Sequence, residues 1–225
     1  MFESKYSKVL TIVLIVVIVA IVVLLGFLAF DYIRNYSSTK QASDFVEDYQ
    51  GDITTSNVES SNTGDGNVEL DISNETTLSD SSTSGANSGK KKYKGYDVLG
   101  TMKIPSLNIE YPILEQNSAG ALNVALILLY PKDNLNKPGN SVIQGHNYRN
   151  GMFFSNLKKI TNGAKIYVTD YTGNSLTYEV YNKFEASSTD SSFYTRDTNG
   201  LAELTLSTCT DASNDIRTIV FAKQI

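Results

Sequence analysis

The sequence is poor in the residue types that commonly form disulfides, metal sites and large aromatic contacts. Among 225 residues it contains one cysteine, one histidine and no tryptophan. A single cysteine excludes an intramolecular disulfide, so this thiol has no covalent partner within the chain. A second membrane span is also absent, because the apolar run at residues 121–130 has ten residues and suits a buried core element. The sequence predicts no cofactor and no metal ion.

One long apolar segment is present near the N-terminus. Residues 9–30 carry no charge, and 22 residues in a helix are enough to cross a hydrocarbon core of about 30 Å. A cleaved signal peptide would have a shorter apolar region and a small-residue cleavage site, so we interpret residues 9–30 as a retained transmembrane helix. Lys5 and Lys8 precede it, and Asp31 follows. The positive-inside rule therefore predicts a single-pass protein of the cell membrane, with residues 1–8 cytoplasmic and the rest outside.

The next segment is acidic and poor in large apolar residues. Residues 31–89 carry eleven Asp and Glu against two basic residues, and they are rich in Ser, Thr and Asn. Such a composition is typical of chains that stay extended in solution. A basic run at residues 90–94 marks its end and is interpreted as a solvated hinge, not a nucleic-acid patch. We therefore predict a flexible linker over residues 31–94 and one folded domain over residues 95–225.

The folded part reads mainly as strands. Seven runs rich in Val, Ile, Thr and Tyr have strand length and are separated in part by turn sequences. They cover residues 96–104, 110–114, 140–144, 164–170, 175–184, 202–208 and 217–225. One helix is predicted over residues 151–160, where the apolar side chains have helical spacing. Many short strands with almost no helix indicate a closed antiparallel barrel or a sandwich.

Three residues with useful chemistry stand at predicted strand ends. Cys209 closes one strand, Arg217 opens the next after a short polar loop, and the lone histidine, His146, follows a third strand. If the first two strands form an antiparallel hairpin, Cys209 and Arg217 lie at the same end of the sheet. A thiolate, an imidazole and a fixed guanidinium together support acyl transfer. The alternative is structural, since a lone Cys is more often a small buried hydrophobe and a lone His or Arg is more often surface or scaffold.

Several short motifs around these residues resemble a known family. The sequences "TLSTC" at 205–209, the Arg eight positions further on, "GNSVIQGHN" at 139–147 and "YPILEQ" at 111–116 are similar to motifs of sortases, the membrane-anchored cysteine transpeptidases of mostly Gram-positive bacteria. The resemblance covers roughly residues 95–225. The motifs do not decide the subclass, although "GHNYRNGMFFSNLKKI" resembles class B members.

The resemblance implies a fold, a reaction and roles for four residues. The fold would be the sortase eight-stranded β-barrel with one or two short helices. Cys209 would be the nucleophile, His146 the general acid/base and Arg217 the stabiliser of substrate and oxyanion, while Thr208 would help to shape the substrate site. The reaction would cleave a sorting signal resembling LPxTG in exported proteins and transfer the acyl group to an amine of the peptidoglycan cross-bridge or its lipid-linked precursor.

Two other functions use the same residues differently. A cysteine protease would form the same thioester and resolve it with water. A non-catalytic β-barrel binding module on a membrane anchor would keep Cys209 buried and unreactive, and it has no reason to reproduce the spacing between Cys209 and Arg217.

Overall fold

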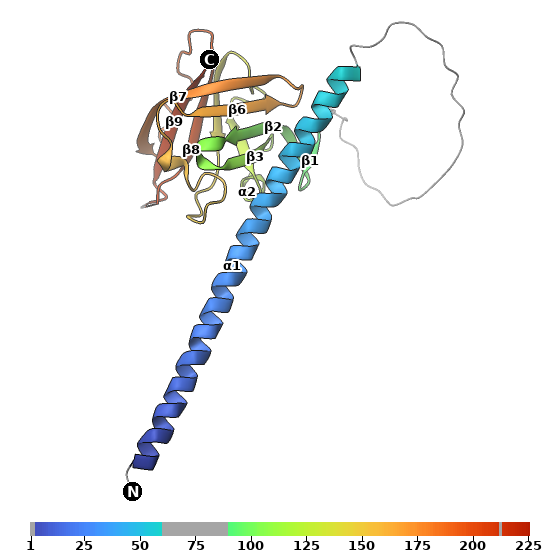
Figure 1. The fold of residues 1–225 in the computed structure, drawn as a ribbon. Coiled ribbons are helices and arrows are strands. Elements are labelled where there is room, and N and C mark those ends of the chain that lie inside the picture. The colour runs from blue at the N-terminus through green and yellow to red at the C-terminus, as the bar shows by residue number, and fades with distance from the viewer. Residues whose placement is uncertain (1–2, 60–89, 212) are drawn as a thin grey trace, which may run out of the picture.

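A computed structural model describes residues 3–59, 90–211 and 213–225. The chain forms two α-helices, two 3-10 helices and nine strands over these residues (Figure 1). In chain order they are α1 (Glu3–Glu59), β1 (Lys92–Tyr93), β2 (Tyr96–Ile104), η1 (Pro105–Leu107), β3 (Ile109–Leu114), α2 (Ala119–Leu122), β4 (Leu126–Tyr130), β5 (Gly139–Gln144), η2 (Leu157–Lys159), β6 (Lys165–Asp170), β7 (Ser175–Ser187), β8 (Ala202–Cys209) and β9 (Ile216–Gln224).

Strands β2 to β9 form a closed eight-stranded barrel. Their order is β2-β3-β4-β5-β8-β9-β7-β6, and pairing of β6 with β2 closes the ring. Closure brings the backbones very close, because a Cβ on Gly100 would collide with the backbone oxygen of Thr169 on the neighbouring strand. Strand β1 adds a two-residue extension to β2. The predicted mainly-β barrel with an apolar N-terminal helix is confirmed.

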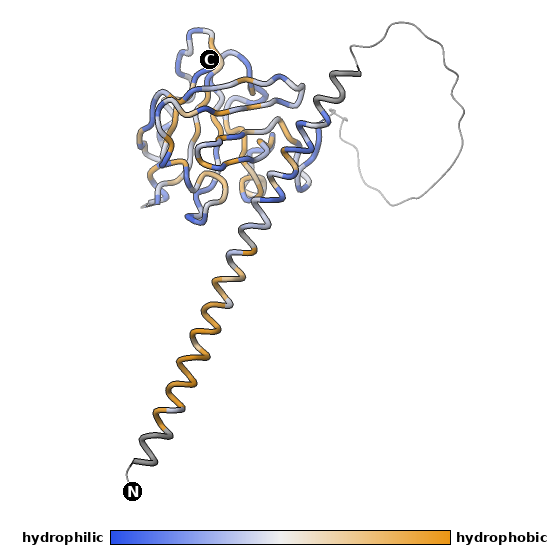
Figure 2. Tube along the Cα trace, in the orientation of Figure 1, coloured by the Kyte–Doolittle hydropathy of each residue, from blue (hydrophilic) through white to orange (hydrophobic). Residues whose placement is uncertain are grey.

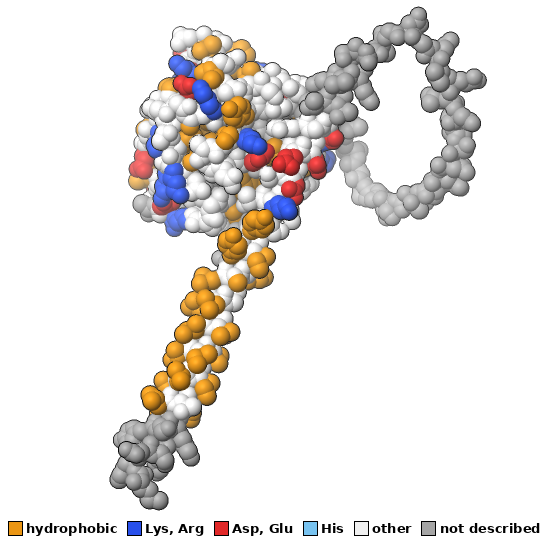
Figure 3. Space-filling model, viewed as in Figure 1, with side chains coloured by type: hydrophobic (Ala, Val, Ile, Leu, Met, Phe, Trp, Pro, Cys, Tyr) orange, Lys and Arg blue, Asp and Glu red, His pale blue; other side chains and the backbone are white. Residues whose placement is uncertain are grey.

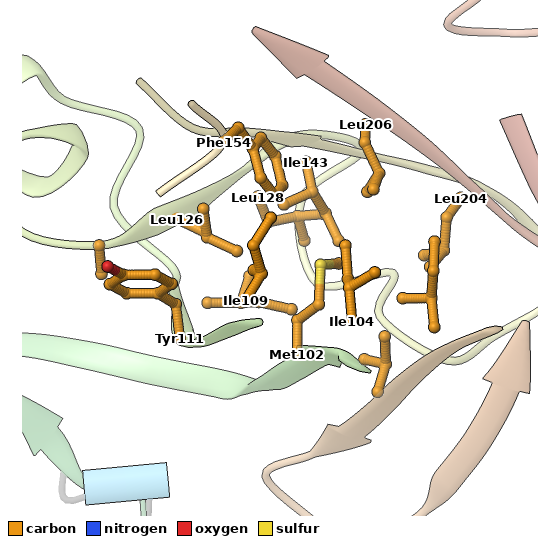
Figure 4. Close-up of a cluster of buried hydrophobic side chains, with 14 of the residues drawn as sticks. Met102, Ile104, Ile109, Tyr111, Leu126, Leu128, Ile143, Phe154, Leu204 and Leu206 are labelled. Carbon is orange, nitrogen blue, oxygen red and sulfur yellow. The ribbon is translucent and has the colours of Figure 1, made fainter. Parts of the chain in front are cut away.

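The barrel interior is filled by branched and aromatic side chains from every wall. Figure 4 shows its centre, with Met102, Leu126 and Leu206 pointing toward one another and Tyr111 at one edge. Strand β8 is buried on both faces: Leu204 and Leu206 belong to this core, while Thr205 and Ser207 are buried outside it. Because this strand of the barrel wall is covered on both faces and paired on both edges, the backbone at its C-terminal residue, Cys209, is firmly held.

Helix α1 is one continuous helix of 57 residues. It contains the apolar segment Val9–Phe30, whose side chains are exposed in the isolated chain and which is long enough to cross a membrane. Figure 2 shows this segment as a continuous hydrophobic stretch, followed by a mixed one where the helix reaches the barrel. The helix does not end with this apolar segment but continues to Glu59, so the prediction of a flexible linker from residue 31 is wrong for residues 31–59.

The C-terminal part of α1 packs on the barrel wall at β3. Ala42, Val46 and Tyr49 are three or four residues apart, hence on one helical face, and all three are buried. Thr39 and Tyr111 share a hydrogen bond of 3.2 Å between their hydroxyls at the edge of this face. We call residues 39–50 the docked segment of α1.

Acidic residues occupy the other side of the docked segment. Asp44, Glu47 and Asp48 are exposed, and Figure 3 shows acidic side chains gathered where α1 meets the barrel. The acidic composition of this segment therefore reflects its solvent-exposed side, and it does not reveal the narrow apolar face that packs on the barrel. Helix nucleation, which is the costly step, is already complete in the apolar segment, so continuing the helix needs only one buried stripe.

The rest of the predicted linker has two parts. Residues 60–89 lie outside the described residues. Residues 92–93 form β1, which pairs with β2, and the Lys90 ammonium lies 3.0 Å from the Glu115 carboxylate. Tyr93 is buried against Phe45 of α1, with ring centroids 4.9 Å apart, and burial raises its pKa to about 12. The folded part therefore begins before residue 95.

The helix predicted over residues 151–160 is also wrong. Only η2 is helical there, and the residues before it form an irregular loop. Gly151 has φ of 89° and Phe153 has φ of 49°, both in the left-handed region, which stops an α-helix from forming. The Asn150 side chain accepts a hydrogen bond from the Met152 backbone at 3.1 Å, so a local side-chain contact takes the place of the first helical turn.

Candidate active site

Strands β8 and β9 form the antiparallel hairpin that the sequence predicts. Cys209 and Arg217 are direct cross-strand partners in its register. Both side chains are half-buried, and Nη1 of Arg217 donates a hydrogen bond to Sγ of Cys209. The thiol is therefore free of any disulfide, accessible and in direct contact with a permanent positive charge.

His146 reaches the same rim from the neighbouring strand. Strand β5 runs parallel to β8, with Gln144 opposite Ser207, so His146 and Cys209 each follow this last pair by two residues. Parallel strands end at the same edge, and the Gly145 backbone still donates to the Ser207 carbonyl at 3.2 Å. The structure therefore brings His146, Cys209 and Arg217 to one end of the barrel.

Thr208 lies between these strand ends. It is buried, and its hydroxyl donates a hydrogen bond of 2.7 Å to the carbonyl oxygen of Gly145, the residue before His146. This contact joins the end of β8 to the end of β5. Thr208 thus supports the backbone on which both His146 and Cys209 stand, while its predicted contact with substrate stays a prediction.

The ring of His146 is held on its edge and on one face. Its Nε2 lies 3.0 Å from Oδ1 of Asn123, and the ring of Tyr148 stacks on it with centroids 4.7 Å apart. An amide oxygen only accepts hydrogen bonds, so Nε2 carries the hydrogen and Nδ1 is the basic nitrogen of the neutral ring. Burial, and to a smaller extent the positive charge of Arg217, lower the pKa of His146 below its ordinary value.

Two asparagines that the sequence reasoning missed complete the rim. Asn123 precedes β4, and Asn147 follows His146 directly. The Asn147 side chain donates to the carbonyl of Cys209 at 3.0 Å and to the carboxylate of Asp211 at 2.8 Å. It therefore ties the segment after the histidine to the segment after the cysteine. Only the position of Asn147 beside the lone histidine could have pointed to it in the sequence, and nothing in the sequence marks Asn123.

The loop between β7 and β8 begins at this rim, since Ser187 at the end of β7 pairs with Ile216, the residue before Arg217. Arg196 lies in this loop, and its Nε and Nη2 donate to the Glu203 carboxylate of β8 at 3.2 and 2.6 Å. The Asn140 side chain donates to the backbone oxygens of Phe193 and Tyr194 at 3.1 and 3.0 Å. The loop is thus fastened to β5 and β8. Burial raises the pKa of Tyr194, and the positive charge of Arg217 partly offsets this.

The groups on this rim are those that cysteine-dependent acyl transfer requires. A thiol can act as a nucleophile, an imidazole can take and return a proton, and a guanidinium can bind an oxyanion. Among residues 3–59, 90–211 and 213–225, no group of three or more His, Cys, Asp or Glu side chains is placed to hold a metal ion. The closed barrel and the three groups at its rim match what a thiol acyltransferase of this architecture would need.

Comparison with known proteins gives the family. The sortase domain matches residues 102–225, more than half of the chain, and the chain belongs to the sortase family. Sortase A of Bacillus anthracis is 29% identical over 126 residues, which are 56% of this chain and 58% of that protein.

Solved sortases share the fold. Sortase A from Corynebacterium diphtheriae is 28% identical with a TM-score of 0.52, over 58% of this chain and 61% of that one. The sortase D5 transpeptidase of Clostridium perfringens is 26% identical with a TM-score of 0.52, over 57% of this chain and 79% of that one. The chain spans less than two thirds of the length of the Bacillus and Corynebacterium relatives. Relatives labelled both A and D5 match, so the comparison assigns the family and no subclass.

Proposed function

We propose that this protein is a cell-surface transpeptidase that cuts a sorting signal in exported proteins and joins the new end to an amine of the cell wall. The observation that carries the proposal is the cross-strand pairing of Cys209 and Arg217 at the rim that His146 also reaches, within a sortase domain. The signal would resemble LPxTG, and the amine would come from the peptidoglycan cross-bridge or its lipid-linked precursor.

In the first half of the proposed reaction, Sγ of Cys209 attacks the carbonyl carbon of the scissile peptide bond. The thiol proton passes to Nδ1 of His146, and Arg217 turns its N–H donors toward the oxyanion. Collapse of the tetrahedral intermediate breaks the C–N bond, and the imidazolium returns the proton to the leaving amine. The product is a thioester on Cys209.

In the second half, an amine attacks the thioester carbonyl. His146 accepts the proton that the amine loses, a new peptide bond forms, and the C–S bond breaks. The proton then returns to the sulfur of Cys209, so the enzyme ends in its starting state. A neutral imidazole is needed at the start of each half, which fits the lowered pKa of His146.

The membrane helix sets where this reaction takes place. We infer that residues 1–8 are cytoplasmic, that residues 9–30 cross the membrane and that the barrel lies outside. Thr39, which hydrogen-bonds to Tyr111 of the barrel, lies nine residues beyond Phe30, and at 1.5 Å per residue this is about 14 Å along the helix. The barrel would therefore stand close to the membrane surface, where exported proteins and lipid-linked precursors both emerge.

The test uses the full chain in lipid nanodiscs with a panel of LPxTG-like peptides, with and without a glycine-rich amine acceptor. We expect a peptide–enzyme thioester on Cys209 by mass spectrometry and an amide product that depends on the acceptor. A hydrolysed product that is insensitive to added amine would identify a protease. Absence of any Cys209 adduct across the panel, with the thiol unreactive toward iodoacetamide, would favour the binding module.

A further inference from the structure

Four aromatic side chains form a continuous series that begins beside helix α1 and ends at the candidate catalytic residue His146. Tyr111 lies 5.0 Å from Phe153 between ring centroids, Phe153 lies 5.7 Å from Tyr148, and Tyr148 lies 4.7 Å from His146. All three spacings are in the range at which aromatic rings attract one another. Tyr111 belongs to β3, and the other three belong to the segment after β5.

Tyr148 is exposed but fixed. Its side chain is 44% accessible, yet one neighbour is the His146 ring and another is the Phe153 ring. Its hydroxyl donates a 3.1 Å hydrogen bond to Oδ1 of Asn123, the same oxygen that accepts from Nε2 of His146. Tyr148 therefore contacts the face of the imidazole and the group that holds its edge.

Phe153 stands in a backbone conformation that a bulky residue rarely adopts. Its φ is 49°, and it is almost completely buried. It forms an isolated β-bridge with Asn147, and the next residue, Phe154, donates its backbone N–H to the carbonyl of His146 at 3.0 Å. Such conformations cost free energy and persist only where the surroundings demand them. Here they fold the loop back under the histidine and press the Phe153 ring against Tyr148.

Tyr111 continues the series to α1. Its ring is buried between Phe153 and the docked segment, and its hydroxyl bonds to Thr39 at 3.2 Å. The Ser43 hydroxyl donates to the neighbouring Glu110 of β3 at 3.4 Å. The docked segment of α1 thus covers the residue at the far end of the aromatic series.

From this continuity we propose that Tyr148 is a positioning residue for His146, held in place by Phe153 and Tyr111, so that the docked segment of α1 supports the histidine from the opposite side. The inference rests on the proposed function for its effect on rate, but its structural part concerns His146 alone. Tyr148 fixes the ring plane and, through Asn123, keeps the hydrogen on Nε2. Nδ1 is then the nitrogen available to exchange a proton with Cys209.

The lone histidine makes the test direct. Labelling the full chain in nanodiscs with ¹³C,¹⁵N-histidine gives one imidazole spin system, whose nitrogen shifts report the tautomer and whose titration reports the pKa. We expect wild type to show mainly the Nε2–H form. Tyr148→Leu should mix the two tautomers and move the titration midpoint. It should also lower the peptide transfer rate about tenfold, because the free energy of one aromatic pair corresponds to at most about that change in rate.

Conservative variants separate the ring from the hydroxyl. Tyr148→Phe keeps the stacking but loses the hydroxyl bond to Asn123, so it should recover most of the rate while the two tautomers still mix in part. Tyr111→Phe removes only the bond to Thr39 and should have the smallest effect. Tyr167→Leu is the matched control, because Tyr167 is also 44% accessible but lies on β6. It should leave the histidine unchanged.

The outcomes separate this inference from the proposed function. An unchanged tautomer and titration in Tyr148→Leu would overturn the positioning role, whatever the enzyme does with peptides. If Tyr167→Leu changed the tautomer ratio and titration midpoint of His146 as much as Tyr148→Leu does, the cause would be a general loosening of the barrel, and the inference would fail. If wild type turned over no peptide but the histidine responded as expected, the inference would stand and the proposed function would not.

Discussion

The two sides of the candidate site are built in different ways. Cys209 and Arg217 stand on one hairpin, eight positions apart in the sequence and directly paired in register, so local strand pairing alone brings them together. His146 stands on an irregular loop. Its ring contacts Asn123 through a hydrogen bond and Tyr148 through stacking, and Tyr148 in turn packs against Phe153. The hairpin side is short-range and stiff, whereas the histidine side is assembled from distant segments. Substitutions far from the site should therefore disturb the position of His146 more than that of Cys209.

The largest expected effect comes from removing one residue from each side. Cys209→Ala should abolish thioester formation, and His146→Ala should lower transfer by about 10²–10⁴-fold, the usual contribution of a positioned acid/base. The double variant should be no worse than Cys209→Ala, because residues that act as a unit are not additive. Single-turnover assays with mass-spectrometric detection of the thioester measure all three. Normal turnover by Cys209→Ala would remove the nucleophile from the mechanism.

Arg217 tests whether the hairpin side works through geometry or through charge. Arg217→Lys keeps the positive charge but loses the two parallel donors, so we expect a loss of about 10²-fold in transfer with an unchanged fold. The matched control is Arg149→Lys, an exposed arginine on the loop after His146. Near-normal transfer by Arg217→Lys, measured beside Arg217→Ala and with thermal midpoints, would show that charge alone suffices.

The docked segment of α1 tests the histidine side from a distance. Val46→Asp places a charge in the buried face, so we expect the segment to leave β3 and transfer to fall by about 2- to 10-fold, which lies within the range found for coupling through packed networks. Gln41→Asp adds the same charge on the exposed side and should change neither.

Hydrogen exchange gives the direct readout of undocking. Amides of residues 39–50 should lose protection in Val46→Asp only, while the barrel strands keep theirs. If the segment undocked and the rate and histidine spectrum stayed as in wild type, α1 would be an anchor with no influence on the site.

The smallest expected effect links the two sides through charge. Because Arg217 and protonated His146 repel, Arg217→Gln should raise the pKa of His146, which the histidine titration measures directly. The midpoint should still lie below that of a free histidine, since burial is the larger cause and remains. A midpoint that does not move would mean that solvent screens the two groups from each other.

Much of the architecture follows from the amino-acid sequence alone. The barrel strands follow from runs of β-branched residues, and the cross-strand pairing of Cys209 and Arg217 follows from two strands joined by a short loop. That residues 9–30 form a helix long and apolar enough to cross a membrane follows from their number and the absence of charge. In each case the deciding interactions are made between residues close together along the chain, or between the chain and a uniform solvent. The local sequence pattern is therefore enough to predict the result.

Tertiary structure decided the rest, because the deciding partners are far apart in sequence. Residues 31–59 have the composition of a linker, and only the surface of β3 turns the stripe containing Val46 into a docked helical face. Residues 151–160 have helical spacing, yet burial of Phe153 between Tyr111 and Tyr148 outweighs that local preference and forces a left-handed backbone. Local propensities amount to fractions of a kcal/mol per residue, whereas burying one large side chain contributes about 1.5–3 kcal/mol, so packing wins wherever the two disagree.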